Sequence, residues 1–452
     1  MHSHVKKVPW TPLSLPLETK EQCSMSAETP RRKRPLLKRL VPQVLTTLAV
    51  SAMLAACSTT TGSTNAPNGT ASASGDDITA QSVDQKALAA TIKKTFLKDI
   101  AVSDLDPVVA DTMAAASKPM TAEQNELFKT CLQQSSCDTG HGSLTVAIAL
   151  ENSNSFASTM RGEATAQALA YPQVKKIVYN NANGDVAAVL ANLRSLVAQK
   201  VDIIVTDPVF GGAVASALQQ AKQAGVTVVT YNTPLPETAA SSVAAQVPLA
   251  LCDLYTEGAQ TLVKELGKNK SYALYTGIPG NSNAAAWQPC AKKVLDGAGW
   301  TQATEGFTQW TAQGAAQAAN ALLASGKEPA AIIYDDTTDD FAKPFIDEHK
   351  TPPAFLSDVM THSWLSLVQQ AKKAGVNTTS WMASSHVWFP RFGVTAGIKI
   401  KEGQPVPSQV SVHVPVVTTD SVLDTNSPDI PSRIPVSSLL TPEQMNLALA
   451  AP

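Results

Sequence analysis

Residues 201–232 form the stretch that most constrains how this 452-residue chain can fold. Its first part, residues 203–206, is a run of β-branched and apolar side chains that is typical of a strand buried on both faces. Asp207-Pro208 ends the run, and small and apolar side chains then recur at helical spacing after Gly211-Gly212. A second apolar run covers residues 226–229. The stretch therefore predicts a β-α-β unit whose two strands are parallel.

Two polar residues of this stretch lie where a ligand is expected. In an open parallel sheet, ligands bind outside the carboxyl ends of the strands. Asp207 and Asn232 each follow one of the two predicted strands, so topology makes both of them candidate ligand contacts. The alternative is a local role for each residue, in which Asp207 caps the following helix and Asn232 turns the chain.

The same alternation of strand and helix recurs on both sides of this unit, and it restarts after Pro248. Further strands are predicted at residues 144–150, 175–180, 271–276, 304–309, 330–334, 353–357, 380–383 and 410–417, and helices at residues 157–171, 186–199, 255–266, 283–298, 312–325, 364–374 and 387–401. Alternating strands and helices predict an α/β protein. Two consecutive halves with a late return strand predict two doubly wound α/β lobes joined by a hinge.

The amino-terminal sequence has the pattern of an export signal. A basic segment at residues 31–39 precedes an apolar run at residues 40–52, which is short for a membrane span, and small residues then lead into Cys57. This pattern resembles the bacterial lipoprotein signal, in which the chain is cut before a cysteine that then carries lipid. The alternative is a chance cysteine in an ordinary signal peptide. Met25 is a second candidate for the start of translation.

Export makes the other cysteines informative, because disulfides persist outside the cytoplasm. Four cysteines follow residue 57, and an even number favours two disulfides. Cys131 and Cys137 enclose a short loop and form the first predicted pair. Elimination then pairs Cys252 with Cys290.

Composition along the chain divides it into a signal peptide, a linker, a helical extension, two lobes and a tail. The linker is rich in Ser, Thr, Ala and Gly, which favours a flexible spacer. The extension carries apolar residues at helical spacing, so it is expected to pack on the main body or to be partly unfolded when alone. The predicted boundaries are residues 1–56 for the signal peptide, 57–79 for the linker, 80–142 for the extension, 143–248 with 384–412 for lobe 1, 249–383 with 413–420 for lobe 2, and 421–452 for the tail.

Four segments, in their order and spacing, carry a resemblance to a known family. They are Asn154-Ser155-Phe156 followed by Arg161-Gly162, residues 201–232, the glycine loop at residues 277–282, and Asp335-Asp336. Over residues 143–418 the chain resembles the type I solute-binding proteins of the ribose- and galactose-binding family, the receptors of ABC importers. The resemblance implies a monomeric clamp that closes on a small polar ligand, most simply a sugar, between two lobes.

The resemblance also implies roles for individual residues. Phe156 would stack on the ligand, and Trp310 would be a second aromatic on the other lobe, with a place in the core of that lobe as its alternative. Trp287 stands where the family commonly has an arginine, and His386 lies at a strand exit that faces the cleft. The full set of predicted ligand-binding residues is Asn154, Phe156, Asp207, Asn232, Trp287, Trp310, Asp335, Asp358 and His386.

Composition and motifs limit the other function classes. The chain has 35 Lys and Arg residues against 37 Asp and Glu residues, and no basic face stands out beyond the first forty residues, which argues against nucleic acid as a partner. The sequence has no G-x-S-x-G elbow, no phosphate loop with a lysine and no ligand set at metal spacing. We therefore predict no catalytic residues, no metal and no cofactor.

Three roles stay open on this fold. The favoured one is a lipid-anchored receptor that delivers its ligand to an ABC permease, and the second is a sensor subunit of a membrane receptor. The third is an exported enzyme that uses Asp335 and Asp358 in the cleft. The ligand class is also open, because Trp287 replaces the usual arginine and Asp335-Asp336 replaces the usual Asn-Asp. A pentose or hexose comes first, then a nucleoside, a polyol or a cationic small molecule.

Overall fold

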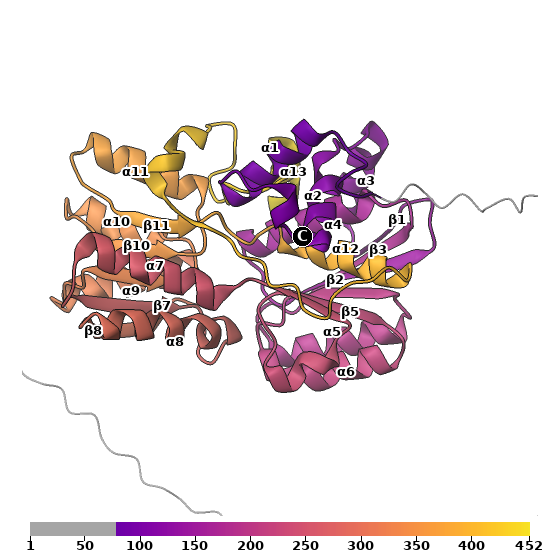
Figure 1. Ribbon diagram of the computed structural model, residues 1–452, viewed down its shortest axis with the longest axis horizontal. Coiled ribbons are helices and arrows are strands. Elements are labelled where there is room, and N and C mark those ends of the chain that lie inside the picture. Colours follow the sequence, from indigo (N-terminus) through magenta and orange to yellow (C-terminus); the bar gives the residue numbers. More distant parts are fainter. Residues whose placement is uncertain (1–77) are drawn as a thin grey trace, which may run out of the picture. The chain divides into compact units, whose positions relative to one another are not determined.

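The structure, a computed structural model, describes residues 78–452. The predicted signal peptide, Cys57 and nearly all of the predicted linker lie outside the described residues. Within residues 78–452 the chain forms two six-stranded sheets, and each sheet has helices on both faces (Figure 1). The predicted fold class, two doubly wound α/β lobes, is confirmed.

The first lobe contains the sheet with strand order β1-β3-β2-β4-β5-β6, in which β1 alone is antiparallel to its neighbour. Its strands are β1 (Ser136–Asp138), β2 (Leu144–Leu150), β3 (Val174–Asn181), β4 (Ile203–Thr206), β5 (Thr227–Asn232) and β6 (Ala245–Pro248). Helices α5 (Val186–Ala198) and α6 (Ala215–Gln223) cover one face, and α4 (Ser155–Leu169) and α12 (Phe389–Lys401) cover the other (Figure 1).

The second lobe repeats this topology with the order β12-β11-β10-β9-β7-β8, and β12 is its antiparallel edge strand. Its strands are β7 (Ser271–Thr276), β8 (Thr301–Phe307), β9 (Ala331–Tyr334), β10 (Ala354–Ser357), β11 (Ser380–Ala383) and β12 (Val416–Thr418). Helices α7 (Leu251–Leu266) and α8 (Ser282–Gly297) pack on one face, and α9 (Ala312–Ala324), α10 (Asp339–Asp347) and α11 (His362–Lys373) pack on the other.

The central unit at residues 201–232 has the predicted form. Strands β4 and β5 are parallel neighbours, with Ile203 opposite Thr227, and all of their residues are buried. A short 3-10 turn, Gly211–Ala213, precedes helix α6, so the helix begins later than the glycine pair suggests. The connection ends at Gly225, whose φ of +86° is the left-handed conformation that favours glycine.

The remaining differences from prediction are short elements. Strands β1 and β6 and helix α10 were not predicted, because three, four and nine residues give little periodicity to detect. The late strand predicted at residues 410–417 is shorter than expected. Only Val416–Thr418 joins the second sheet, while Gln409 and Val412 form isolated bridges beside β6 in the first lobe.

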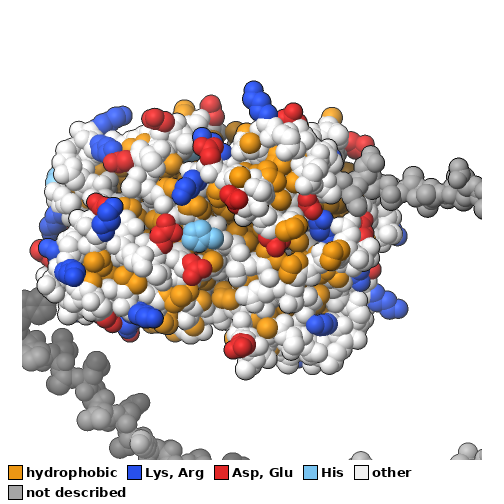
Figure 2. Space-filling model, viewed as in Figure 1, with side chains coloured by type: hydrophobic (Ala, Val, Ile, Leu, Met, Phe, Trp, Pro, Cys, Tyr) orange, Lys and Arg blue, Asp and Glu red, His pale blue; other side chains and the backbone are white. Residues whose placement is uncertain are grey.

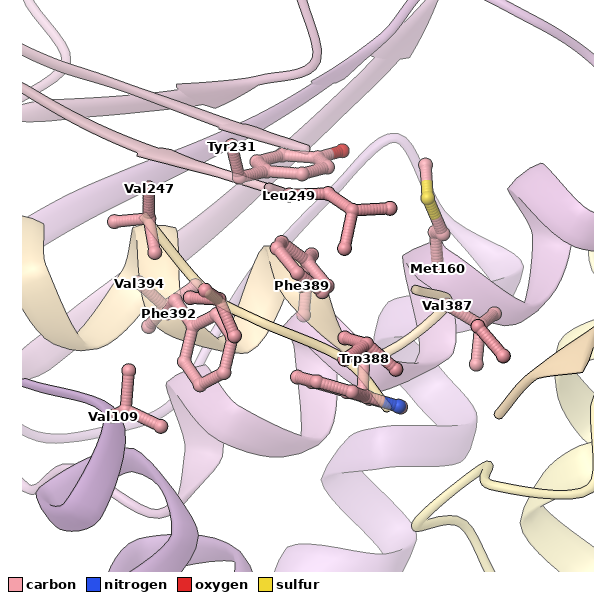
Figure 3. Close-up of a cluster of buried hydrophobic side chains, with 14 of the residues drawn as sticks. Val109, Met160, Tyr231, Val247, Leu249, Val387, Trp388, Phe389, Phe392 and Val394 are labelled. Atoms are coloured by element: carbon pink, nitrogen blue, oxygen red, sulfur yellow. The ribbon is translucent and has the colours of Figure 1, made fainter. Parts of the chain in front are cut away.

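Helix α12 is the element through which the first lobe is assembled. Every residue from Phe389 to Ile398 is buried, and the one charged residue among them, Arg391, pairs with the buried Glu163 of α4. Figure 3 shows the aromatic rings of Trp388, Phe389 and Phe392 between Tyr231 of β5 and Val109 of the extension. The helix therefore joins the first sheet to the amino-terminal helices.

The amino-terminal extension packs on the first lobe, which is the first of the two alternatives given for it in the sequence analysis. Its helices are α1 (Gln85–Phe96), α2 (Pro107–Ser117) and α3 (Ala122–Gln133), and they lie over α4 and α12 (Figure 1). An almost buried ion pair, Lys399 Nζ to Asp111 Oδ2 at 2.6 Å, ties α12 to α2. The ring of Phe96 meets the ring of Trp388 edge-on, with centroids 5.2 Å apart.

The carboxyl-terminal tail connects the two lobes. It begins on the second lobe with a 3-10 segment (Thr419–Thr425) and then runs beside the start of α11, where Val436 N donates a hydrogen bond to Met360 O at 2.9 Å. It passes next to the segment between β11 and α12, where Ser437 Oγ donates to Ser384 O at 2.9 Å. It ends as helix α13 (Pro442–Leu449) against α4 and α3 of the first lobe and its extension.

Both predicted disulfides are present. Cys131–Cys137 links the end of α3 to β1, and Cys252–Cys290 links α7 to α8. In the part of the chain from residue 78 onward, no helix has the length and apolar character that a membrane crossing requires.

Two helical glycines provide a test of the packing of α12. A Cβ at Gly393 would lie against Val205 Cγ1 of β4, so we expect Gly393→Ala to lower the free energy of unfolding by roughly 1–3 kcal/mol through overpacking. A Cβ at Gly297, in α8, would extend into open space, so Gly297→Ala is the matched control and should raise stability by roughly 0.5–1 kcal/mol. Urea denaturation of both variants measures the two effects. Equal effects of the two substitutions would contradict this packing.

Candidate functional site

A cleft lies where the carboxyl ends of both sheets meet. It encloses about 580 Å³ of empty space, part of it open to solvent. Seven of the nine predicted ligand-binding residues line it: Asn154, Phe156, Asp207, Asn232, Trp310, Asp335 and His386. The sequence analysis did not assign the other lining residues, which include Glu151, Asn152, Asn283 and Asp336.

Topology explains why the residues converge. In each sheet the order in which strands are added reverses beside the first parallel strand, between β2 and β4 in one lobe and between β7 and β9 in the other. Ligands of doubly wound sheets bind at such a switch point. Asp207 directly follows β4 and Asp335 directly follows β9, so the two carboxylates occupy equivalent positions in the two lobes.

Asp207 and Asn232 form one polar pair in the first lobe. Asn232 Nδ2 donates to Asp207 Oδ2 at 2.7 Å, and the backbone N of Thr233 donates to Asp207 Oδ1 at 3.2 Å. The φ of Asn232 is +59°, which asparagine tolerates better than most residues. Asp207 does not cap helix α6, whose amino terminus has no side-chain cap. Burial raises the pKa of Asp207 to about 6.

Glu151 is the main site residue that the sequence analysis missed. It directly follows β2 and is only 3% exposed. Its Oε2 accepts a hydrogen bond from the backbone N of Phe210 at 3.2 Å, whereas its Oε1 has no partner. Burial, and then the neighbouring Asp207, raise the pKa of Glu151 well above its usual value. The rule that singled out Asp207, a polar residue directly after a buried strand, also applies to Glu151.

Asp335 is held by three donors in the second lobe. Its Oδ2 accepts from Thr276 Oγ1 at 2.6 Å and from Trp287 Nε1 at 2.9 Å, and its Oδ1 accepts from Trp310 Nε1 at 3.1 Å. Burial raises the pKa of Asp335 to about 6, against the effect of these donors.

Trp287 does not lie where the sequence analysis expected it. Its side chain is fully buried and is not part of the cleft lining. The ring stacks on Tyr255 of α7, with centroids 4.4 Å apart, because α8 directs this position toward the interior of the lobe. A direct ligand contact does not fit this position. Trp287 instead holds Asp335 in place from behind.

Two more carboxyl groups lie beside Asp335. Asp336 lines the cleft and accepts a hydrogen bond from Tyr334 Oη at 3.2 Å, and burial raises its pKa to about 7. Asp358 directly follows β10 but lies behind the lining, with its Oδ2 3.8 Å from His386 Nδ1. Burial raises the pKa of Asp358 well above its usual value, and its Oδ1 has no hydrogen-bond partner.

Aromatic faces complete the cleft. The rings of Phe156 and His386 lie 4.7 Å apart and are tilted by 57°. Trp310 is half-buried and lines the cleft, so it is not a residue of the lobe's core. Its ring lies directly against Gly277, where any side chain would collide with it. The glycine loop after β7 therefore provides the space that positions Trp310.

The two lobes touch each other at the edge of the cleft. Ser282 N donates to Val209 O at 3.1 Å, and Thr233 Oγ1 donates to Asn283 Oδ1 at 2.9 Å. Each of these hydrogen bonds joins a residue of the first lobe to a residue of the second. The two lobes are therefore in direct contact beside the cleft.

The arrangement is suited to binding. Buried carboxylates and amides supply hydrogen-bond acceptors, and aromatic rings supply flat apolar faces, which together hold small polar molecules. Among residues 78–452 there is no group of three or more His, Cys, Asp or Glu side chains that could hold a metal ion.

Comparison with known proteins identifies the fold independently. The profile of the family described as periplasmic binding protein domain matches residues 146–382. No curated protein sequence is detectably similar to the chain.

Several solved structures share the fold at low sequence identity. A solute-binding protein from Bacillus halodurans C-125 with bound myo-inositol has a TM-score of 0.55 and 14% identity, over 63% of this chain and 98% of its own. A Mycobacterium smegmatis protein in complex with β-D-fucofuranose has a TM-score of 0.54 and 16% identity, over 62% and 94%. The arabinose-binding protein of Shewanella sp. ANA-3 has a TM-score of 0.53 and 17% identity, over 62% and 93%.

The raised pKa of Asp336 leads to a prediction on stability. The pKa of Asp336 is about 7 in the folded protein and ~4 in the unfolded chain. Between these two pH values the folded protein binds more protons than the unfolded chain, so its stability falls as pH rises. Asp336→Asn removes this cost. As pH rises from 5 to 8, the stability of the variant relative to the parent should rise by up to about a hundredfold in the unfolding equilibrium.

Chemical denaturation of both proteins at several pH values measures this difference. The comparison must be made against the parent, because His386, whose pKa burial lowers to about 3, acts on stability in the opposite direction. A difference between the two proteins that does not change with pH would contradict the burial of an ionisable group at Asp336.

Proposed function

Because the chain belongs to the periplasmic binding protein domain family, we propose that it is an extracytoplasmic receptor that captures a small polyhydroxylated ligand, a sugar or a related polyol, between its two lobes. The resemblance inferred from four sequence segments is confirmed by the family match. As a member of a family of binding proteins, the chain is a receptor and not an enzyme.

One observation carries the proposal. The cleft at the switch points of both sheets is lined by buried hydrogen-bond acceptors from both lobes and by aromatic rings. Hydroxyl groups donate to carboxylates such as Asp207 and Asp335, while the C–H faces of a sugar pack on rings such as Phe156 and Trp310. The bound molecules of the structural neighbours, myo-inositol, β-D-fucofuranose and L-arabinofuranose, are compatible with this chemistry.

The partner of such a receptor would be an ABC permease, to which the closed form delivers its ligand. The proposal includes attachment of the monomeric protein to the outer face of the cell membrane by lipid at Cys57. A sensor subunit of a membrane signalling receptor is the alternative role. Basic side chains are distributed among acidic ones over the face shown in Figure 2.

Ligand binding at the cleft can be tested by thermal shift. A soluble form with Cys57→Ser is screened against monosaccharides, nucleosides, polyols and polyamines, because a ligand that binds the folded state raises the melting temperature. We expect Phe156→Ala and Asp207→Ala to abolish the shift caused by the best ligand. Phe307→Ala is the matched control, since this phenylalanine is 50% exposed and does not line the cleft.

Two results would count against the site. If both cleft variants kept the full shift, the ligand would bind elsewhere. If the variants melted far below the parent without ligand, loss of the shift would reflect unfolding, so circular dichroism of each variant is recorded first.

Lipid attachment has a separate test. When the full chain is expressed in a bacterium with a lipoprotein pathway, we expect the protein in the membrane fraction and the Cys57→Ser variant in the soluble fraction. Replacement of Cys131 by Ser is the control, because that cysteine is paired with Cys137 and should not affect fractionation. Retention of Cys57→Ser in the membrane would exclude this cysteine as the anchor.

A further inference from the structure

The cleft is lined by acidic side chains without basic ones. Four of its lining residues are acidic, Glu151 and Asp207 from the first lobe and Asp335 and Asp336 from the second, and none is Lys or Arg. His386 supplies no compensating charge, because burial keeps its ring neutral near pH 7.

Several acceptors in the cleft have no donor. Glu151 Oε1 and Asn232 Oδ1 belong to lining residues that are no more than 3% exposed, and neither atom has a hydrogen-bond partner. The same is true of Asp358 Oδ1, immediately behind the lining. A buried acceptor without a donor costs free energy, so the occupant that suits this cleft is rich in donors.

The donors that the protein itself supplies are neutral. Asp207 is held by an amide and a backbone N–H, and Asp335 is held by a hydroxyl and two indole N–H groups. In the adjoining pocket at the entrance, Arg433 pairs with Asp340 at 3.1 Å and not with a residue of the cleft. Among residues 78–452, no Lys or Arg pairs with the carboxyl groups of the cleft, and burial raises their pKa values, which a bound cation would lower again.

An organic cation fits this cleft better than a metal ion. Among the described residues the carboxyl groups do not converge into a set that could hold a metal. Aromatic rings also line the cleft together with these carboxyl groups, and the face of a tryptophan or phenylalanine ring attracts an ammonium group. An ammonium provides three hydrogen-bond donors and a full positive charge.

We propose that the ligand of this cleft carries a protonated amine, as an amino sugar or an aminated polyol does. The proposal rests on the proposed function and narrows its ligand class. Glu151 and Asp207 on one side, or Asp335 and Asp336 on the other, would receive the ammonium group, and the remaining acceptors would receive hydroxyl groups.

A matched panel of ligands tests the proposal. D-Glucosamine, D-galactosamine, D-mannosamine and scyllo-inosamine are each compared with the neutral parent hexose or inositol and with the N-acetylated form, by thermal shift and then by calorimetry at low ionic strength. We expect at least one amine to bind at least tenfold more tightly than its neutral parent and its N-acetylated form. Acetylation is the sharpest control, because it keeps the nitrogen but removes its charge.

Charge-neutralising variants then locate the amine. Glu151→Gln and Asp336→Asn are made singly, and we expect at least one of them to reduce the ratio of amine affinity to neutral-parent affinity by tenfold or more. Asp99→Asn is the control, since it changes the net charge equally but lies on the exposed surface of the extension. A preference that all three variants retain would overturn the proposal.

The outcomes separate this proposal from the proposed function. Neutral sugars or inositol that bind as tightly as the amines would overturn the inference about charge while supporting the sugar receptor. If no member of the panel bound, both the amine proposal and the sugar receptor would be contradicted.

Discussion

Burial of carboxyl groups is costly unless their oxygens find donors, and this constraint organises the residues around and beneath the cleft. Asp335 shows it most clearly, since two tryptophans and a threonine are directed at its oxygens. Trp287 is buried for this reason, and its stacking on Tyr255 connects the site to the core of the second lobe. Asp207 has a simpler support, an asparagine at the end of the next strand, in a backbone conformation that asparagine tolerates. Asp207 and Asp335 thus occupy equivalent positions in the two lobes but have different hydrogen-bond partners.

Much of the fold could be predicted because buried parallel strands have a strong local signature. The run at β4 and the start of β5 after Gly225 are apolar and β-branched, and the structure places them side by side in register. The rule that ligands meet strand ends located Asp207 and Asn232 in the cleft from their positions alone, and the family resemblance added Asp335. Both disulfides followed from counting, since four cysteines outside the amino-terminal segment leave few pairings.

What could not be predicted depends on the direction of side chains and on long-range packing. The sequence did not distinguish the places of Trp287 and Trp310. Helix α8 directs Trp287 into the core of the lobe, whereas Gly277 leaves room for the ring of Trp310 at the cleft. Glu151 meets the same positional rule as Asp207, but a loop glutamate gives no sign that its carboxylate will be buried. The short elements β1, β6 and α10 take their stability from the elements on which they pack, so their own residues show little pattern.

Because the carboxyl-terminal tail packs on both lobes, it affects how the protein unfolds. Val422 and Val436 are buried with the second lobe, while Met445 and Ala448 are buried with the first. Two domains joined only by linkers can melt independently, whereas domains that share buried apolar residues lose them together. If one lobe unfolded, the tail would be released from it. The apolar surface that the tail covers on the remaining lobe would then be less protected. We therefore expect the tail to couple the unfolding of the two lobes, so that both unfold in a single melting transition.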